Sequence, residues 1–133
     1  MDSDGAGTSG LSILVVENDP VARDVLLEHL RRCGFRILES QHGGASIRAA
    51  YDQAFEYIVT DIDWSDVSDG SALARWVTAN QPRTRVILTS KTLTHWFPVG
   101  SVMGALPLIR KPFKPEDLDR LLAPVVVASI PGA

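Results

Sequence analysis

The sequence predicts an α/β fold in which a five-stranded parallel sheet is doubly wound, with helices on both faces. Two observations indicate it. Short apolar segments alternate with longer amphipathic segments along most of the chain, as in a series of strand–helix units. The first apolar segment, residues 13–16, is a continuous run, which is typical of a strand covered on both faces. At 133 residues the chain is long enough for one domain with a genuine core.

The first helix has clear signals at both ends. Asp19 and Pro20 form an N-cap residue followed by a proline at the first helical position. Apolar residues then recur at spacings of three and four residues as far as Cys33. Gly34 ends the helix.

The middle of the chain continues the alternation of strands and helices. A weaker strand is predicted at 36–40 and a helix at 45–54, after a pair of glycines. A third apolar run predicts a strand at 57–61. The polar residues 63–69 predict a loop, which leads through Gly70 into the next helix.

The last part of the chain completes the predicted sheet. Pro82 separates the preceding helix from a fourth strand at 86–88. Residues 91–104 contain a proline and a glycine, so the helix of this region is predicted to be short or irregular. A fifth strand is predicted at 106–110 and a final helix at 114–127.

The domain organisation follows from these elements. One folded domain is predicted over residues 11–123. Residues 1–10 are polar and glycine-rich, which is typical of a flexible tail. The apolar extension at 124–133 either lengthens the last helix or contacts a partner, and the sequence leaves both readings open.

Composition excludes several classes of protein. No apolar run approaches the ~20 residues of a membrane span, and no signal-peptide pattern opens the chain, so the expected location is the cytoplasm. The net charge of −3, with both signs spread along the chain, argues against nucleic-acid binding through a basic face. The single cysteine, Cys33, excludes an internal disulfide framework and a cysteine-built zinc site.

The candidate functional residues follow the strands. In a doubly wound sheet the ligand site lies beyond the carboxyl ends of the strands. The turn after the first strand contains acids and no glycine-rich sequence, which excludes a Rossmann dehydrogenase and a P-loop enzyme. The residues predicted to gather at this edge are Glu17, Asn18, Asp61, Thr89, Ser90 and Lys111.

These residue types suit phosphoryl chemistry. Acids at two strand ends, with an amide between them, offer oxygen ligands to a hard cation such as Mg²⁺. A hydroxyl from Thr89 and an ammonium from Lys111 would complete a cradle for a phosphoryl group. Asp61 would then be a nucleophile that accepts the phosphoryl group.

Four segments carry a resemblance to a known family: ILVVENDP (13–20), YIVTDIDWSDVSDG (57–70), VILTS (86–90) and RKPFKPEDL (110–118). On these motifs the sequence resembles the receiver domains of two-component response regulators, over about residues 11–122. The implied fold is flavodoxin-like, as in CheY-like proteins. The loop after Asp61 is similar to that of alphaproteobacterial single-domain receivers.

The resemblance implies a magnesium site. Glu17 and Asn18 match the acidic pair of the family, and Asp61 matches the phosphoacceptor that also binds the metal. The backbone carbonyl of Asp63 matches a further protein ligand.

The resemblance also implies how the phosphoryl group is held. Thr89 matches the switch hydroxyl, and Lys111 matches the lysine that pairs with the phosphoryl group, before a Pro112 whose peptide bond is usually cis. The implied donor is a histidine kinase or a histidine phosphotransfer protein. Such a domain is a signalling phosphoacceptor, which catalyses at most its own phosphorylation and dephosphorylation.

The expected output is protein contact, or passing the phosphoryl group on, because only about a dozen residues remain after Leu121. The downstream partner is unspecified, and a homodimer is one assembly that the sequence allows.

The sequence departs from the family pattern at three places. Asn18 replaces an aspartate, and the lost charge is expected to weaken magnesium binding by roughly 1–3 kcal/mol. Leu108 stands where many receivers carry an aromatic residue that changes rotamer. Trp96 and Phe97 interrupt an ordinary amphipathic helix. These departures concern signalling more than fold.

Two alternatives to the phosphoacceptor stay open. The first is a pseudo-receiver, an interaction module that works without phosphorylation, which Asn18 and Leu108 allow. The second is a Toprim-like metal-dependent nucleic-acid enzyme, since Glu17 with an Asp-x-Asp at Asp61 resembles that site. The second leaves Thr89 and Lys111 unexplained, and the acidic balance disfavours it.

Three aromatic residues each have two possible roles. Trp96 and Phe97 form either a partner-binding patch or part of the core, and Trp64 either shields the site or packs on its loop.

Among the titratable residues, His29 and His42 have no partner ligands nearby in the sequence and are expected to be structural or solvated. No phosphohistidine role is expected for His95. Cys33 is expected to be a small core hydrophobe.

Overall fold

A computed structural model describes residues 10–40, 43–62, 67–91 and 100–128. Strands and helices alternate along the chain in the predicted order. The elements are β1 (Ser12–Val16), α1 (Pro20–Arg32), β2 (Arg36–Ser40), α2 (Gly43–Asp52), β3 (Tyr57–Asp61), α3 (Val67–Asn80), β4 (Arg85–Ser90), α4 (Val102–Ala105), β5 (Leu108–Arg110) and α5 (Pro115–Ala128).

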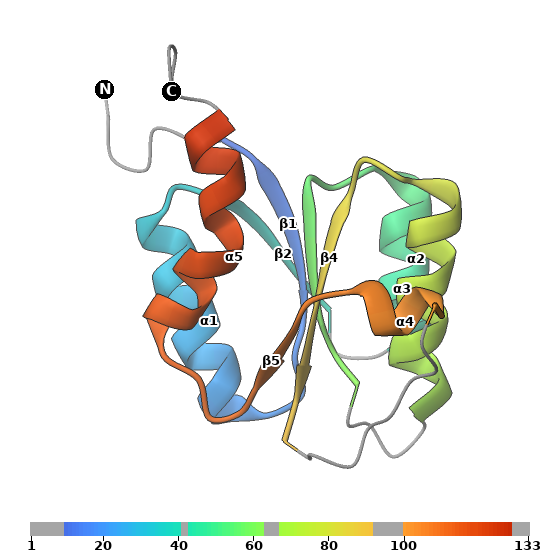
Figure 1. The fold of residues 1–133 in the computed structure, drawn as a ribbon, viewed down its shortest axis with the longest axis horizontal. Coiled ribbons are helices and arrows are strands. Elements are labelled where there is room, and N and C mark those ends of the chain that lie inside the picture. Colours follow the sequence, from blue (N-terminus) through green and yellow to red (C-terminus); the bar gives the residue numbers. More distant parts are fainter. Residues whose placement is uncertain (1–9, 41–42, 63–66, 92–99, 129–133) are drawn as a thin grey trace.

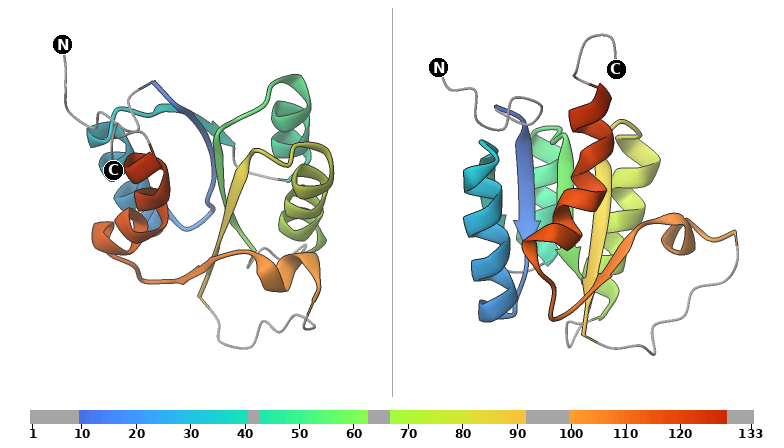
Figure 2. Two further views of the ribbon diagram at one scale, coloured as in Figure 1. Left: turned by 45° about the horizontal axis from the view of Figure 1, so that its top comes forward. Right: turned by 60° about the vertical axis from the view of Figure 1, so that its left-hand side comes forward.

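The strands form one parallel sheet in the order β2-β1-β3-β4-β5. Helices α1 and α5 cover one face, and α2, α3 and α4 cover the other (Figures 1 and 2). The predicted five-stranded, doubly wound α/β sheet is therefore confirmed. The strand order reverses between β1 and β3, so the edge beyond these two strands is the expected place for a ligand.

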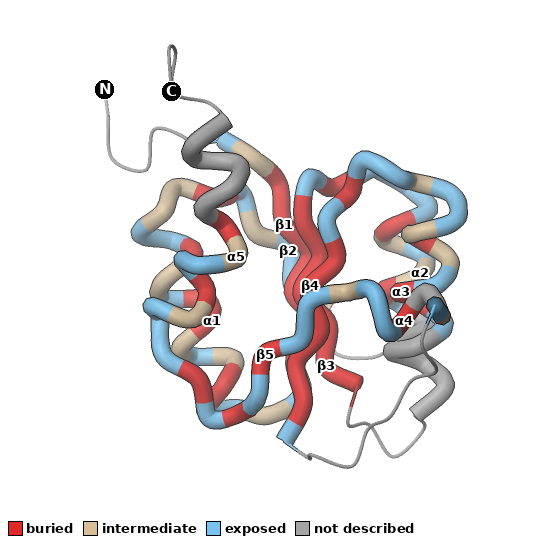
Figure 3. The backbone as a smooth tube through the Cα atoms, in the orientation of Figure 1, coloured by how far each residue is buried: buried red, intermediate tan, exposed pale blue. Residues whose placement is uncertain are grey.

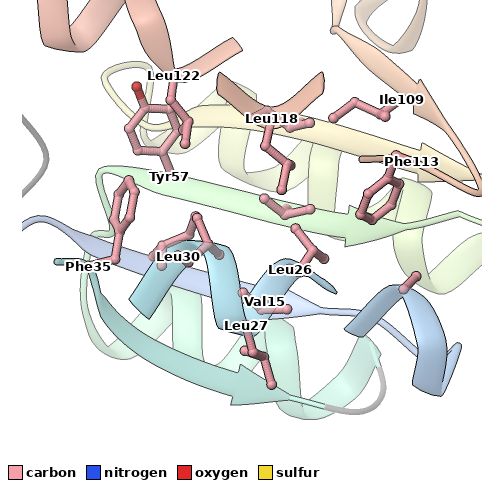
Figure 4. Packing of buried hydrophobic residues seen from close by; sticks show 14 residues of the cluster. Val15, Leu26, Leu27, Leu30, Phe35, Tyr57, Ile109, Phe113, Leu118 and Leu122 are labelled. Atoms are coloured by element: carbon pink, nitrogen blue, oxygen red, sulfur yellow. The ribbon is translucent and has the colours of Figure 1, made fainter. Parts of the chain in front are cut away.

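The sheet separates two hydrophobic clusters. Consecutive residues of a strand point to opposite faces, so Ile13 belongs to one cluster and Leu14 to the other. The first cluster joins the sheet to α1 and α5 through residues such as Leu26, Leu30 and Leu118 (Figure 4). The central strands are buried along most of their length (Figure 3).

The amino end of the sheet is held by side-chain hydrogen bonds. The Ser12 backbone N–H and hydroxyl both donate to Oε1 of Glu56, each at 2.7 Å. The Thr84 hydroxyl donates to the carbonyl of Phe55 at 2.6 Å. These bonds tie the residues at the start of β1 and β4 to the segment that precedes β3.

Some element boundaries differ from the prediction. Helix α3 begins at Val67, inside the segment 63–69 that was expected to be a loop. The expectation of a loop rested on the polar composition of this segment, and polar residues also occur in the first turn of a helix. Helix α2 spans Gly43–Asp52, two residues earlier than expected.

The last strand and the short helix before it also refine the prediction. The expected strand 106–110 begins at Leu108, because Leu106 is the C-cap residue of α4. Helix α4 has four residues, in agreement with the short helix predicted for this region.

The start of α1 is set by its proline. Asp19 occupies the N-cap position with extended backbone, but its side chain makes no capping hydrogen bond. Pro20 is the first helical residue, and its fixed φ angle suits that position. At the other end Gly34 adopts a φ of 86°, which a glycine tolerates without strain.

No helix in the described part of the chain has the length and the apolar character needed to cross a bilayer.

Candidate functional site

Four polar side chains from four strands lie together at the carboxyl edge of the sheet. Glu17 follows β1, Asp61 ends β3, Thr89 lies in β4 and Lys111 follows β5. All four are buried, with relative exposures of 1%, 3%, 0% and 6%. Buried ionisable side chains need partners of opposite charge or hydrogen bonds, and each of these residues has them.

Glu17 is the centre of the arrangement. The Lys111 ammonium donates to Oε2 of Glu17, with the two atoms 2.5 Å apart, and the Thr89 hydroxyl donates to Oε1 at 2.8 Å. The backbone N–H of Asp19 also donates to Oε2, at 3.1 Å. The Lys111 ammonium is 3.0 Å from Oδ2 of Asp61, so one cation bridges two carboxylates.

Backbone hydrogen bonds hold the strand ends in place. The N–H of Ile62 donates to the carbonyl of Thr89 at 3.0 Å, and the N–H of Lys111 donates to the carbonyl of Ser90 at 2.7 Å. These bonds continue the pairing of the sheet beyond Asp61 and up to Lys111. The charged side chains are therefore carried by a backbone that is itself fixed.

Burial and charge shift the pKa values of two groups. Burial raises the pKa of Glu17 above its ordinary value, and the negative charge of Asp61 raises it further, against the opposing effect of Lys111. Burial alone would lower the pKa of Lys111, but hydrogen bonds and ion pairs with Glu17 and then Asp61 outweigh it and raise the pKa.

The charges of this site suit a small cation. The carboxylates of Glu17 and Asp61 face the single ammonium of Lys111, which leaves one net negative charge among three buried ionised groups. Carboxylate oxygens are the ligands that Mg²⁺ prefers in proteins. The residues present at this edge therefore fit a magnesium ion.

A comparison with known families shows which family the chain belongs to. The family model described as "Response regulator receiver domain" matches residues 13–123. The chain belongs to this family. The residues matched include β1 except for its first residue, Ser12, the other four strands and the greater part of α5. They also include the four buried polar side chains at the carboxyl edge.

Relatives of this receiver domain include proteins named as transcriptional regulators. The chain is 28% identical over 113 residues to the transcriptional regulatory protein GltR of Pseudomonas aeruginosa, an alignment that covers 83% of this chain and 46% of GltR. The chain thus spans under half the length of that relative.

Solved structures show the same fold. The receiver domain of the sensor histidine kinase PA1611 from Pseudomonas aeruginosa PAO1, solved with magnesium coordinated in its active site cleft, is 26% identical, with a TM-score of 0.71 over 90% of this chain and 99% of that one. The structure of histidine kinase ThkA in complex with the response regulator protein TrrA matches at 21% identity and a TM-score of 0.69, over 86% and 97% of the two chains.

The receiver domain brings together four of the six residues with a predicted role in the site. Glu17, Asp61, Thr89 and Lys111 are in contact through the hydrogen bonds and ion pairs described above. Asn18 is exposed, although it adjoins Glu17. The predicted carbonyl ligand at 63 lies outside the described residues.

Other predictions have mixed outcomes. The Lys111–Pro112 peptide bond is cis, as the resemblance implies, and Leu108 is 42% exposed. The alternatives for Trp64, Trp96 and Phe97 fall outside the described residues, as do the histidines at 42 and 95.

The sequence did not predict the role of Glu17 as a shared acceptor. Thr89 and Lys111 were each assigned to a phosphoryl group, whereas in the structure both donate to Glu17. The one available signal was charge: Lys111 was the one basic residue among the predicted site residues, and it needed an acidic partner if it was to be buried.

Proposed function

We propose that this receiver domain accepts a phosphoryl group on Asp61, in a magnesium-dependent reaction, and transmits the signal by protein contact. The observation that carries the proposal is the placement of the Asp61 carboxylate. It is buried at the end of β3, with the Lys111 ammonium 3.0 Å away and a second acid, Glu17, bound to the same ammonium.

The proposed transfer is a displacement at phosphorus. An Asp61 carboxylate oxygen forms a bond to phosphorus while the P–N bond of a phosphohistidine donor breaks, and the imidazole leaves with the electron pair. Lys111 is placed to offset negative charge on the phosphoryl oxygens, because its ammonium already contacts Asp61. We assign to Thr89 a hydrogen bond to the same group, which requires it to leave Glu17.

Four groups would hold magnesium: the carboxylates of Glu17 and Asp61, the amide oxygen of Asn18 and the backbone carbonyl of Asp63. When bound, the ion supplies positive charge that neutralises the phosphoryl oxygens. Asn18 contributes no charge, so we expect the affinity for magnesium to be weakened. The magnesium in the PA1611 receiver supports the assignment of the ion.

The proposed donor is a histidine kinase or a histidine phosphotransfer protein in the cytoplasm. The complex of TrrA with the kinase ThkA supports such a partner, since TrrA shares this fold. The proposal makes the chain a signalling domain whose catalysis is limited to its own phosphorylation and dephosphorylation, without direct binding of nucleic acid or membrane.

A pseudo-receiver is the second candidate function. The exposed amide of Asn18 and the half-exposed aliphatic side chain of Leu108 favour it. They remove one charge from the metal site and the aromatic ring of the usual switch. In this case the chain would bind its partner without any change at Asp61.

The test is intact mass after incubation with Mg²⁺ and acetyl phosphate. We expect one phosphoryl adduct on the wild type, no adduct without Mg²⁺, and none on Asp61→Asn. Asp52→Asn, which removes an exposed carboxylate at the end of α2, is the matched control and should label like the wild type. No wild-type adduct, together with labelling of Asn18→Asp, would favour the pseudo-receiver.

A further inference from the structure

A second cluster of ligand-type side chains lies between α1 and α5, on one face of the sheet. His29 belongs to the last turn of α1, Cys33 is the C-cap residue of that helix, and Asp119 belongs to α5. One potential ligand atom from each of the three lies within 4.8 Å of the others. Because 90 residues of sequence separate His29 from Asp119, the cluster exists only in the folded chain.

The distances within the cluster are short. Nε2 of His29 is 2.6 Å from Oδ1 of Asp119 and 3.7 Å from Sγ of Cys33. His29 and Cys33 are four residues apart, so they lie on the same side of the helix end. The same imidazole nitrogen thus faces both a thiol and a carboxylate.

We propose that His29, Cys33 and Asp119 form a binding site for Zn²⁺ that joins α1 to α5. Zinc bonds of about 2.0–2.3 Å in tetrahedral geometry place neighbouring ligand atoms roughly 3.3–3.7 Å apart. The sulfur–nitrogen distance already matches this spacing. The nitrogen–oxygen pair must open by roughly 0.7 Å, which Asp119 can do because its side chain is 60% exposed.

The donor set selects the class of metal. Thiolate and imidazole are ligands of zinc and similar transition metals, whereas magnesium takes oxygen ligands and belongs at the carboxyl edge. Three protein ligands leave a fourth position for water, and the exposure of Asp119 keeps that position open to solvent. The carboxyl end of α1 also carries the negative end of the helix dipole, which favours a cation.

The proton balance of the site is simple. Burial, and then the charge of Asp119, raise the pKa of the Cys33 thiol, so the thiol is protonated at neutral pH in the absence of metal. Binding forms a sulfur–zinc bond and a nitrogen–zinc bond. The thiol proton is released to solvent, and the Nε2 proton that His29 donates to Asp119 is released from a charged ring or moves to Nδ1 in a neutral ring. No oxidant or further reactant is needed.

The site differs from what the sequence indicated. A lone cysteine argues against a zinc site built from cysteines, and His29 was not predicted to pair with Cys33 four residues later in the sequence. The fold supplies the missing partner, because α1 and α5 lie side by side on one face of the sheet (Figure 1). The proposal is independent of phosphorylation at Asp61.

The experiment is a Co²⁺ titration of the full chain without an affinity tag, followed by competition with Zn²⁺. Cobalt bound through a thiolate gives a sulfur-to-metal charge-transfer band, which a carboxylate site cannot give. We expect this band at one equivalent of Co²⁺ in the wild type and its displacement by Zn²⁺. The magnesium site therefore cannot produce a false positive.

Variants locate the metal. Cys33→Ser should abolish the charge-transfer band, while His29→Gln and Asp119→Asn should weaken the apparent affinity at least tenfold. Glu28→Gln is the matched control on α1 and Glu116→Gln is the control on α5; both residues are exposed, and both variants should bind cobalt like the wild type. Circular dichroism of each variant confirms its fold.

Two results would overturn the proposal. One is the absence of a thiolate–cobalt band in the wild type at millimolar Co²⁺. The other is equal affinity in the wild type and in Asp119→Asn, which has an exposed side chain and therefore folds normally. The first result would show that His29 and Asp119 form an ion pair only, with Cys33 as a packing residue. The second would show that Asp119 is not a ligand, so that no metal joins α1 to α5.

Discussion

Each end of the sheet has a glutamate, and the pKa values of the two are shifted in opposite directions. At the carboxyl end Glu17 is buried, and burial raises its pKa. At the amino end Glu56 is exposed, and hydrogen bonds from the side chain and then the backbone of Ser12 lower its pKa. The two glutamates differ in solvent access and in the partners that their neighbours supply.

The difference separates a functional end from a structural one. At the amino end the carboxylate charge is stabilised by donors that lie in the strand itself, so the ion contributes to the fold. At the carboxyl end two buried carboxylates share one ammonium. The carboxylates can therefore bind a cation, and the ammonium can pair with a phosphoryl group. Such an arrangement costs stability, as functional sites often do.

Removing the ammonium of Lys111, which Glu17 and Asp61 share, should give the largest loss of stability. Lys111→Met leaves Glu17 and Asp61 buried without their partner, and we expect a loss of about 3–5 kcal/mol in the free energy of unfolding. Urea denaturation without Mg²⁺ measures it. Lys114→Met, at an exposed lysine three residues later, should change stability by less than about 0.5 kcal/mol.

A loss for Lys111→Met no greater than that for Lys114→Met would contradict the comparison. It would mean that the buried ion pairs of Lys111 contribute no more to the free energy of unfolding than the charge of an exposed lysine.

Placing a negative charge at position 18, beside Glu17, tests whether the carboxyl end of the sheet binds a cation. Asn18→Asp adds a carboxylate to a site that already has a net negative charge, so it should strengthen Mg²⁺ binding by roughly 1–3 kcal/mol, or about 5- to 150-fold in Kd. Isothermal titration calorimetry with MgCl₂ measures the change. The matched control is Asn80→Asp at the exposed end of α3, which should bind Mg²⁺ like the wild type.

An unchanged Kd in Asn18→Asp would show that this position does not contribute a ligand.

The smallest predicted loss of stability is for a substitution at Glu56, at the amino end of the sheet. Glu56→Gln replaces charge-assisted acceptance from Ser12 with a neutral bond, and exposure screens the charge, so we expect a loss of about 1 kcal/mol at neutral pH. Because the pKa of Glu56 is lowered in the folded chain, its contribution is present above the ordinary value of 4.5 and disappears as the pH falls through the folded pKa.

Thermal unfolding of wild type and Glu56→Gln at several pH values tests the sign. The two Tm values should converge on acidification. Glu17 should behave in the opposite sense, because its pKa is raised: the stability linked to its protonation is full below 4.5 and is lost as the pH rises through the folded pKa. A difference between wild type and Glu56→Gln that stays constant down to acidic pH would exclude an ionic role for Glu56.

Much of the fold could be predicted because the strands carry strong local signals. The run at 13–16 is apolar throughout, and the run at 57–59 is apolar before Thr60 and Asp61; the structure places strands at both. The start of α3 was wrong because polar residues serve both in loops and in the first turn of a helix. Its helical assignment depends on packing further along, where Leu73 and Val77 are buried.

The site could be predicted as a set of residues but not as a network. Topology alone brings the ends of parallel strands to one edge, so the gathering of Glu17, Asp61 and Lys111 follows from the strand assignments. Which oxygen binds which nitrogen depends on side-chain rotamers and burial, and these have no signature in the sequence. The pairing of His29 with Asp119 was missed for a related reason, because two distant helices meet only after the sheet forms.

The two hydrophobic clusters on either side of the sheet have a consequence for how the protein tolerates change. Ile13 and Leu14 are chain neighbours that belong to different clusters, as are Ile58 and Val59. The clusters lie on opposite faces of the sheet, so the effects on stability of one substitution in each should be nearly additive where the two sites are more than about 7–10 Å apart. The layer containing α1 and α5 can therefore accumulate mutations, and acquire new binding properties, with little constraint from the layer containing α2 and α3.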